Sequence, residues 1–207
     1  MSGGFIVVLA ILAFAAVTIF KGVRIVPQGY KWIVQRLGKY HTTLSPGLNF
    51  VIPYVDEVAY KVTTKDIVLD IPSQEVITRD NAVLLMNAVA YINITTPVNA
   101  VYGIENYTWA IQNLVQTSLR SIVGEMDLDD ALSSRDHIKA KLKAAISDDI
   151  SDWGITLKTV EIQDIQPSST MQAAMEAQAA AERQRRATVT KADGEKQAAI
   201  LEADGRL

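Results

Sequence analysis

The chain has 207 residues, a formal net charge of −3 and no cysteine. The lack of cysteine excludes disulfides and thiolate chemistry, although it does not fix the compartment. The charge is unevenly distributed: residues 1–55 carry five basic residues and no acid, whereas acids outnumber bases by eight in the remainder. An acidic bulk argues against nucleic acid as a partner.

The N-terminal twenty residues contain no ionisable side chain, and Lys21 and Arg24 follow them. A helix over residues 3–20 would rise about 27 Å, close to a hydrocarbon core of about 30 Å. The sequence therefore predicts a transmembrane anchor over residues 1–24, with a cleaved signal peptide or a buried core helix as the alternatives. Because the basic residues follow the span, we expect a single-pass protein of the inner (plasma) membrane with the bulk of the chain on the cytoplasmic side.

The segment after the anchor combines basic and apolar residues. Lys21 and Arg24 are expected to contact lipid headgroups, at about 1 kcal/mol per basic residue near the surface, although topology alone would explain their position. Residues 29–40 predict a strand, and the run LSPGLNFVIPYVDEV follows as a turn. This run is expected either to enter the membrane interface or to form a buried strand end, and its apolar residues are Leu48, Phe50, Ile52 and Tyr54.

Alternating apolar residues predict further strands at residues 57–71, 74–79 and 82–95. Asp80 and Asn81 supply the turn chemistry between the last two. The pattern is typical of a mostly antiparallel meander.

Helical periodicity begins after this meander. It predicts one helix over residues 111–124 and a second over residues 133–154, with a capping-box-like start at Ser133. Residues 155–165 alternate again and should return as a strand. Together, residues 25–166 predict one α+β domain, in which helices cover the sheet.

The C-terminal segment, residues 167–207, lacks aromatic residues and is rich in Ala, Glu, Arg, Lys and Gln. It predicts a long helix in which small residues recur at an offset of eleven, so that they run nearly straight along it. We expect this helix to pack against identical neighbours as a coiled coil, the alternative being a solvated, partly frayed single helix. The expected oligomer interface comprises Ala181, Ala187, Ala192, Gly194, Ala198 and Ala203.

No pattern in the sequence indicates catalysis. His41 and His137 are more than ninety residues apart and fit no triad or metal motif. The acidic residues between 125 and 130 lack the glycine and the distal Glu of a calcium loop. We therefore expect no enzyme activity, no cofactor and no metal.

Several segments carry a family resemblance. They are PQGY at 27–30, RLGKY at 36–40, LSPGLNFVIP at 44–53, LDIPSQEVITRDN at 69–81, SLRSIVGEMDLDDALSSRD at 118–136, WGI at 153–155 and VEIQDI at 160–165. In this order they resemble the SPFH, or band 7, superfamily of stomatin, prohibitin, flotillin and HflK/HflC, and within it the bacterial stomatin-like (paraslipin) branch.

The resemblance implies an SPFH domain against the membrane, a long outward helix and a large homo-oligomeric ring or cage that organises a membrane microdomain. The partners that it implies are membrane lipids, further copies of the chain, and an FtsH-type AAA protease or an NfeD-type protein. The alternative function is a regulatory subunit of such a protease, which controls substrate access. Members of this branch continue through further repeats, so the helix over residues 167–207 is expected to be incomplete at its C-terminus.

Overall fold

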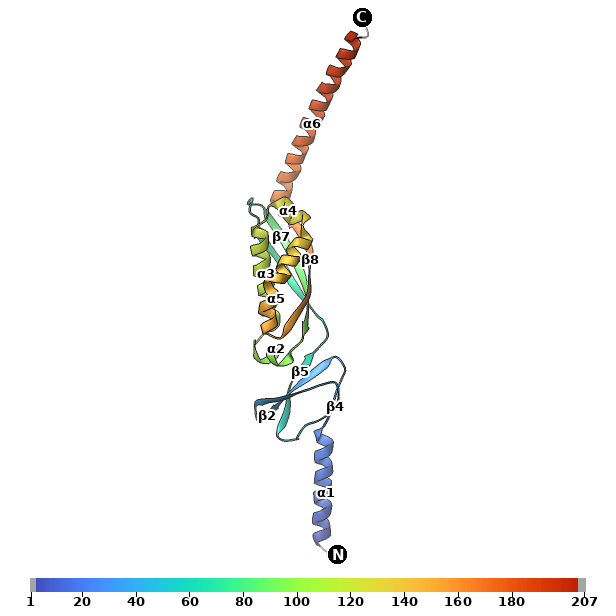
Figure 1. The fold of residues 1–207 in the computed structure, drawn as a ribbon, viewed down its shortest axis with the longest axis vertical. Helices are drawn as coiled ribbons and strands as arrows, with labels where there is room; N and C mark the ends of the chain where they lie inside the picture. The colour runs from blue at the N-terminus through green and yellow to red at the C-terminus, as the bar shows by residue number, and fades with distance from the viewer. Residues whose placement is uncertain (1–2, 205–207) are drawn as a thin grey trace.

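The structure, a computed structural model, describes residues 3–204 of an elongated molecule. Helix α1 lies at one end, helix α6 at the other, and the sheets lie between them (Figure 1). The helices are α1 (Gly3–Gly22), α2 (Pro97–Tyr102), α3 (Tyr107–Gly124), α4 (Leu128–Ser133), α5 (Arg135–Asp152) and α6 (Ser169–Asp204). The strands are β1 (Val23–Val26), β2 (Tyr30–Arg36), β3 (Lys39–Leu44), β4 (Gly47–Phe50), β5 (Asp56–Thr63), β6 (Ile67–Ile77), β7 (Val83–Ile94) and β8 (Ile155–Pro167).

Two small antiparallel sheets follow α1. One pairs β1 with β4, and the other has the order β3-β2-β5. They share a small core of Val26, Val34, Leu44 and Val51. Gly22 connects this unit to α1 at close range, because a Cβ there would lie 2.8 Å from the carbonyl oxygen of Val51.

The larger unit is an antiparallel sheet of order β6-β7-β8, with α3 and α5 packed on one face (Figure 1). Strand periodicity explains this layer, since the even-numbered side chains of β7, such as Leu84 and Met86, are fully buried beneath the helices. The helices contribute Ile111, Leu119 and Leu142 to the same core. The predicted α+β architecture with a long C-terminal helix is confirmed.

The expected strand over residues 57–71 is wrong, because the chain turns between β5 and β6. The Thr63 hydroxyl accepts a hydrogen bond from the backbone N–H of Lys65 at this turn. Strand β6 then continues through Pro72, because a bulge between Ile71 and Gln74 places the proline outside the ladder. The predicted turn at Asp80 and Asn81 is present, with Asn81 at a φ of 65°.

The predicted capping-box start at Ser133 is also wrong. Ser133 ends the short helix α4, and its hydroxyl donates to the carbonyl oxygen of Asp129. Helix α5 begins at Arg135, after Ser134. The sequence predicted one helix from Ser133 onward and did not identify α4 as a separate helix.

The predicted transmembrane anchor over residues 1–24 is a further error. Among residues 3–204, no helix is both long enough and apolar enough to cross a membrane. The apolar part of α1 extends from Phe5 to Phe20, a rise of roughly 24 Å against a hydrocarbon core of about 30 Å. The predicted single-pass topology depended on this segment and has no support without it.

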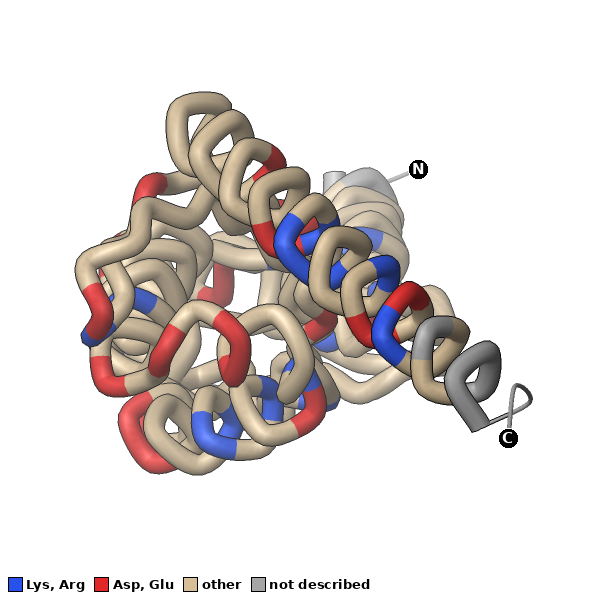
Figure 2. The backbone as a smooth tube through the Cα atoms, turned by 90° about the horizontal axis from the view of Figure 1, so that it is seen from above, with Lys and Arg blue, Asp and Glu red and all other residues tan. Residues whose placement is uncertain are grey.

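Helix α6 extends away from the domain over 36 residues. It joins the sheet through Ser168, whose backbone N–H donates to the carbonyl oxygen of Val83 at 2.9 Å. Almost all of its described side chains are exposed. Viewed along the long axis, basic and acidic residues are interspersed along its middle part (Figure 2).

Candidate functional site

The strongest candidate site is a group of exposed apolar side chains beside the end of α1, which we call the apolar end. The pairing of β1 with β4 places Ile25 opposite Leu48 and Val23 opposite Phe50. The four side chains singled out in the sequence are all exposed: Leu48, Phe50, Ile52 and Tyr54, at 63%, 70%, 53% and 71%. Contiguous exposed apolar surface of this kind marks an interaction site with a protein or a membrane.

Basic residues border the apolar end. The Lys21 ammonium group lies 5.7 Å from the ring centroid of Tyr54, within the range of a cation–π contact. Lys21 and Arg24 line one cavity of about 590 Å³ between the end of α1 and the loop that carries Tyr54. The two predicted headgroup-binding residues thus lie together, next to the apolar side chains.

An ion pair fixes the loop of the apolar end. The Arg36 guanidinium donates to both carboxylate oxygens of Asp56, at 2.6 and 3.0 Å, and the backbone N–H of Ile52 donates to the same carboxylate at 2.9 Å. The hydrogen bond from Arg36 is the main cause that lowers the pKa of Asp56 from 3.8 to about 2. The carboxylate is 3% exposed, so it holds the loop between residues 52 and 56 from the inside.

Sequence reasoning missed Leu37 at this site. Leu37 is 85% exposed, and its backbone N–H donates to the carbonyl oxygen of Val55, which places the β2–β3 turn beside the loop of the apolar end. Leu37 and Tyr54 have positive φ angles of 52° and 74°, in a region that bulky residues rarely occupy. The available signal was the placement of Leu before Gly38 in a tight turn, where a polar residue is usual.

The predicted oligomer-interface residues lie on α6, and the helix divides them between two lines. Ala181 and Ala192 are eleven residues apart and lie on one line. Ala187, Gly194 and Ala198 lie on a second line, about 120° away at 100° per residue. All five are exposed, whereas the side chain of Ala203 lies outside the described residues.

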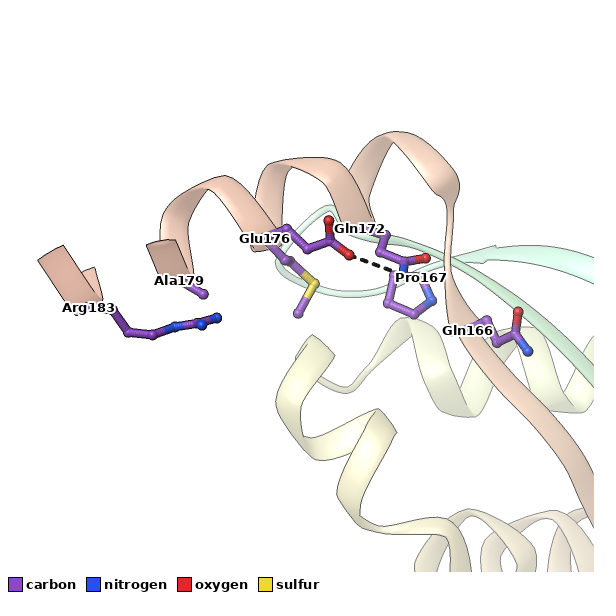
Figure 3. A pocket seen from close by; sticks show the side chains of 7 residues that line it. Gln166, Pro167, Gln172, Glu176, Ala179 and Arg183 are labelled. Carbon is purple, nitrogen blue, oxygen red and sulfur yellow. Dashed lines mark hydrogen bonds between the residues drawn. The ribbon is translucent and has the colours of Figure 1, made fainter. Parts of the chain in front are cut away.

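The base of α6 forms a cavity of about 610 Å³ with the end of β8. Figure 3 shows Gln172, Glu176, Ala179 and Arg183 following one another along the helix, with Gln166 and Pro167 near its base. The Gln172 amide donates to the Glu176 carboxylate at 3.4 Å. The cavity is open and shallow, which suits contact with a neighbouring chain better than enclosure of a small ligand.

The two histidines lie apart on the surface of the molecule. Both His41 and His137 are exposed, on β3 and α5. Among the described residues, no three His, Asp or Glu side chains converge as metal ligands would.

Comparisons with known proteins show what the chain is similar to. The family model described as SPFH domain / Band 7 family matches residues 24–196. A stomatin homolog of Pyrococcus abyssi is 40% identical over 195 residues, which cover 94% of this chain and 72% of that protein. A stomatin-like protein of Caenorhabditis elegans is 37% identical over 183 residues, covering 88% and 56%. An uncharacterized protein of Mycobacterium tuberculosis is 36% identical over 191 residues, covering 92% of this chain and 50% of that protein, so the chain spans half the length of this mycobacterial relative.

Proposed function

The chain belongs to the SPFH/Band 7 family, and from this membership we propose that it is a stomatin-like scaffold that assembles many copies into a ring or cage on a membrane and organises the lipids and proteins there. The observation that carries the proposal is the separation of two uncovered surfaces. The apolar end lies beside α1, and the exposed helix α6 begins at the opposite side of the domain (Figure 1).

The apolar end supports contact with a lipid surface. Exposed side chains such as Phe50 and Tyr54 would gain about 25 cal/mol for each Å² of apolar area that they remove from water. Lys21 and Arg24 add attraction to anionic headgroups, which are concentrated in the cytoplasmic leaflet of the plasma membrane. We therefore place the protein on the cytoplasmic face of the inner membrane.

Helix α6 supports assembly of identical chains. Its exposed small residues let a neighbouring backbone approach closely, and its two lines of small residues suit a helix with one neighbour on each side. In a ring every subunit has two such neighbours. Among the described residues, no atom outside the surrounding helix backbone lies within 4 Å of the position that a Cβ of Gly194 would take, which leaves room for a second helix.

The scaffold would act without chemistry of its own. A regulatory role toward an FtsH-type membrane protease, or a complex with an NfeD-type protein, is compatible with the same assembly. In that case the ring would control which substrates reach the partner.

Vesicle flotation and imaging of the detergent-extracted particle test the proposal. We expect the full chain to float with vesicles that contain anionic lipid, and a Leu48→Ser/Phe50→Ser variant to lose most of this binding. Trp109→Ser is the matched control, because Trp109 is 65% exposed on α3, away from the apolar end. Imaging should show rings or cages. The proposal would be contradicted if the wild type and both variants floated equally well, or if imaging showed only single chains. A protease recovered in stoichiometric amount would favour the regulatory role.

A further inference from the structure

The sheet β6-β7-β8 has a second face that α3 and α5 do not cover, which we call the open sheet face. The ladder register identifies it: Leu69, Ile71 and Val76 of β6 point toward the helices, so their sequence neighbours outside the bulge, such as Asp70 and Glu75, point away. Three apolar side chains on this face are exposed, Val68 at 59%, Ile77 at 57% and Leu85 at 37%. An antiparallel sheet with this much apolar surface on its second face has a surface suited to a partner.

The open sheet face is acidic. Asp70 and Glu75 project from β6, and Asp164 projects from β8 opposite Asn87. The described strands β6 and β7 contain no Lys or Arg, and β8 contains one basic residue, the exposed Lys158 at its bulge. Within residues 3–204 none of these three carboxylates has a cation at ion-pair distance.

The opposite side of the same layer carries the complementary charge. The first half of α5, residues 135–143, has the cations Arg135, Lys139, Lys141 and Lys143 against one acid. Over the part of the chain that the structure describes, Arg135 has no carboxylate partner, and Lys141 reaches Glu125 only at 3.9 Å. We call these residues the basic α5 segment.

We propose that the open sheet face of one copy binds the basic α5 segment of the next copy. This inference rests on the proposed function and specifies which surfaces of the domain meet in the assembly. The two surfaces lie on opposite sides of one sheet, so the contact is head-to-tail and leaves one free surface of each kind, which the next copies occupy. Such a contact closes into a ring when the rotation between neighbours permits it.

Charge and geometry favour a second copy over an unrelated partner. The chain itself supplies both halves of the contact, and the ion pair between Lys139 and Glu161, at 2.5 Å, shows that α5 and β8 side chains pair at the edge of this layer. Because both surfaces lie on the sides of the elongated molecule (Figure 1), we take the long axes of neighbouring copies to be parallel. All apolar ends then face one way, and all α6 helices face the other.

Charge reversal on the full chain tests the contact. One variant, Asp70→Lys/Glu75→Lys, makes the open sheet face basic, and the other, Arg135→Glu/Lys141→Glu, makes the basic α5 segment acidic. Each variant alone should need at least about a tenfold higher concentration to form the large particle, because like charges then meet across the contact. An equimolar mixture should assemble as the wild type does, since every reversed surface finds its complement on the other variant.

The matched control is Glu57→Lys/Glu105→Lys, which adds the same charge at two exposed positions outside both surfaces. Circular dichroism checks that each variant is folded. If a reversed variant does not fold, the neutral pairs Asp70→Asn/Glu75→Gln and Arg135→Gln/Lys141→Gln replace it. The salt concentration that halves the assembled fraction should then fall at least about twofold for each.

The outcomes separate the two proposals. If the wild type assembles and the reversed variants assemble equally well, or if the folded variants do not rescue each other in the mixture, this contact is wrong and the scaffold proposal stands. The contact is likewise wrong if the neutral pairs do not change the salt concentration that halves the assembled fraction. If the wild-type chain stays monomeric under all conditions, both proposals are overturned.

Discussion

Two residues of the apolar end occupy backbone conformations that cost free energy. Leu37 and Tyr54 have φ angles of 52° and 74°, and the left-handed region costs a non-glycine residue roughly 1–2 kcal/mol. Both direct a large apolar side chain into solvent, 85% and 71% exposed. Backbone strain at exposed apolar residues has a physical reason when a binding partner contacts those side chains.

Replacement of Leu37 by Asn should separate stability from binding. Asn tolerates a positive φ better than Leu, so Leu37→Asn should leave the free energy of unfolding unchanged or raise it by up to about 1 kcal/mol. Its binding to anionic vesicles should fall. Leu37→Ala is the control, since it removes the apolar contact but keeps the strain. Urea denaturation and flotation measure the two effects, and full lipid binding by both variants would exclude Leu37 from the contact surface.

The ion pair between Arg36 and Asp56 predicts a pH dependence. The pKa of Asp56 is about 2 in the folded chain and 3.8 in the reference state, so its stabilisation is complete above pH 3.8 and is lost as the pH falls through 2. Between pH 4 and pH 2 the free energy of unfolding should therefore fall more steeply for the wild type than for Asp56→Asn. Denaturation curves across this range give the comparison, and parallel slopes would show that the carboxylate does not stabilise the loop.

Helix α6 receives little support from the rest of its own chain. A single amphipathic helix normally gains its stability from packing, yet nearly all described residues of α6 are exposed. Its interspersed charges, such as Glu182 with Arg185 and Arg186, each add only a few tenths of a kcal/mol. In the proposed assembly, neighbouring helices along the lines of small residues would supply this packing.

Substitution of Ala192 by Leu tests these lines directly. A bulky side chain at a close helix contact costs about 1–3 kcal/mol, so Ala192→Leu should reduce the large particle in size-exclusion chromatography. Asp193→Leu is the control, because the exposed Asp193 lies about 100° from both Ala192 and Gly194 around the helix, away from both lines. Leu is a good helix former, so lost helicity would not explain a defect. Equal particle sizes for both variants would place the contact elsewhere.

Considered as a whole, the molecule consists of a packed centre and two ends with little packing. The main core joins the sheet β6-β7-β8 to α3 and α5 and includes Ile33 and Val62 from the smaller unit. This shared core fixes the apolar end relative to the larger sheet. By contrast, α6 touches the domain mainly through its first turns and β8.

Deletion of residues 169–207 should therefore spare the fold and remove the assembly. The free energy of unfolding of the remaining core should change by about 0.5 kcal/mol or less, as for other changes confined to exposed surface. Light scattering should at the same time show loss of the large particle. A large drop in stability would mean that α6 is part of the core.

Periodicity predicted the fold well where each element buries one face. The alternation in β7 and the apolar spacing of α3 reflect burial directly, so their type and place followed from the sequence. The bulge at Pro72 was harder to predict from the sequence, because a strand can continue past a proline there only if β6 is an edge strand. Leu48, Phe50, Ile52 and Tyr54 were identified by their apolar character. Leu37 joins them only through a contact between distant segments.

The predicted anchor and the open sheet face show where prediction from sequence patterns alone fails. The predicted span counted Gly3 and Gly4 toward its length, although neither adds apolar surface. The open sheet face cannot be recognised without the strand order, since Asp70 and Asp164 are more than ninety residues apart in sequence. Sequence patterns report what each segment buries, and the chain topology decides which uncovered faces lie together.

The length of α6 gives the proposed assembly a height. Its 36 residues rise about 54 Å at 1.5 Å per residue, and in copies that stand side by side these helices would form a continuous wall of that height above the domains, on the side away from the bilayer. Lipids inside and outside the assembly would exchange only through gaps between the domains at the foot of this wall. Membrane proteins with bulky domains on that side would be confined or excluded, so the barrier would sort its neighbours by shape and need no specific recognition.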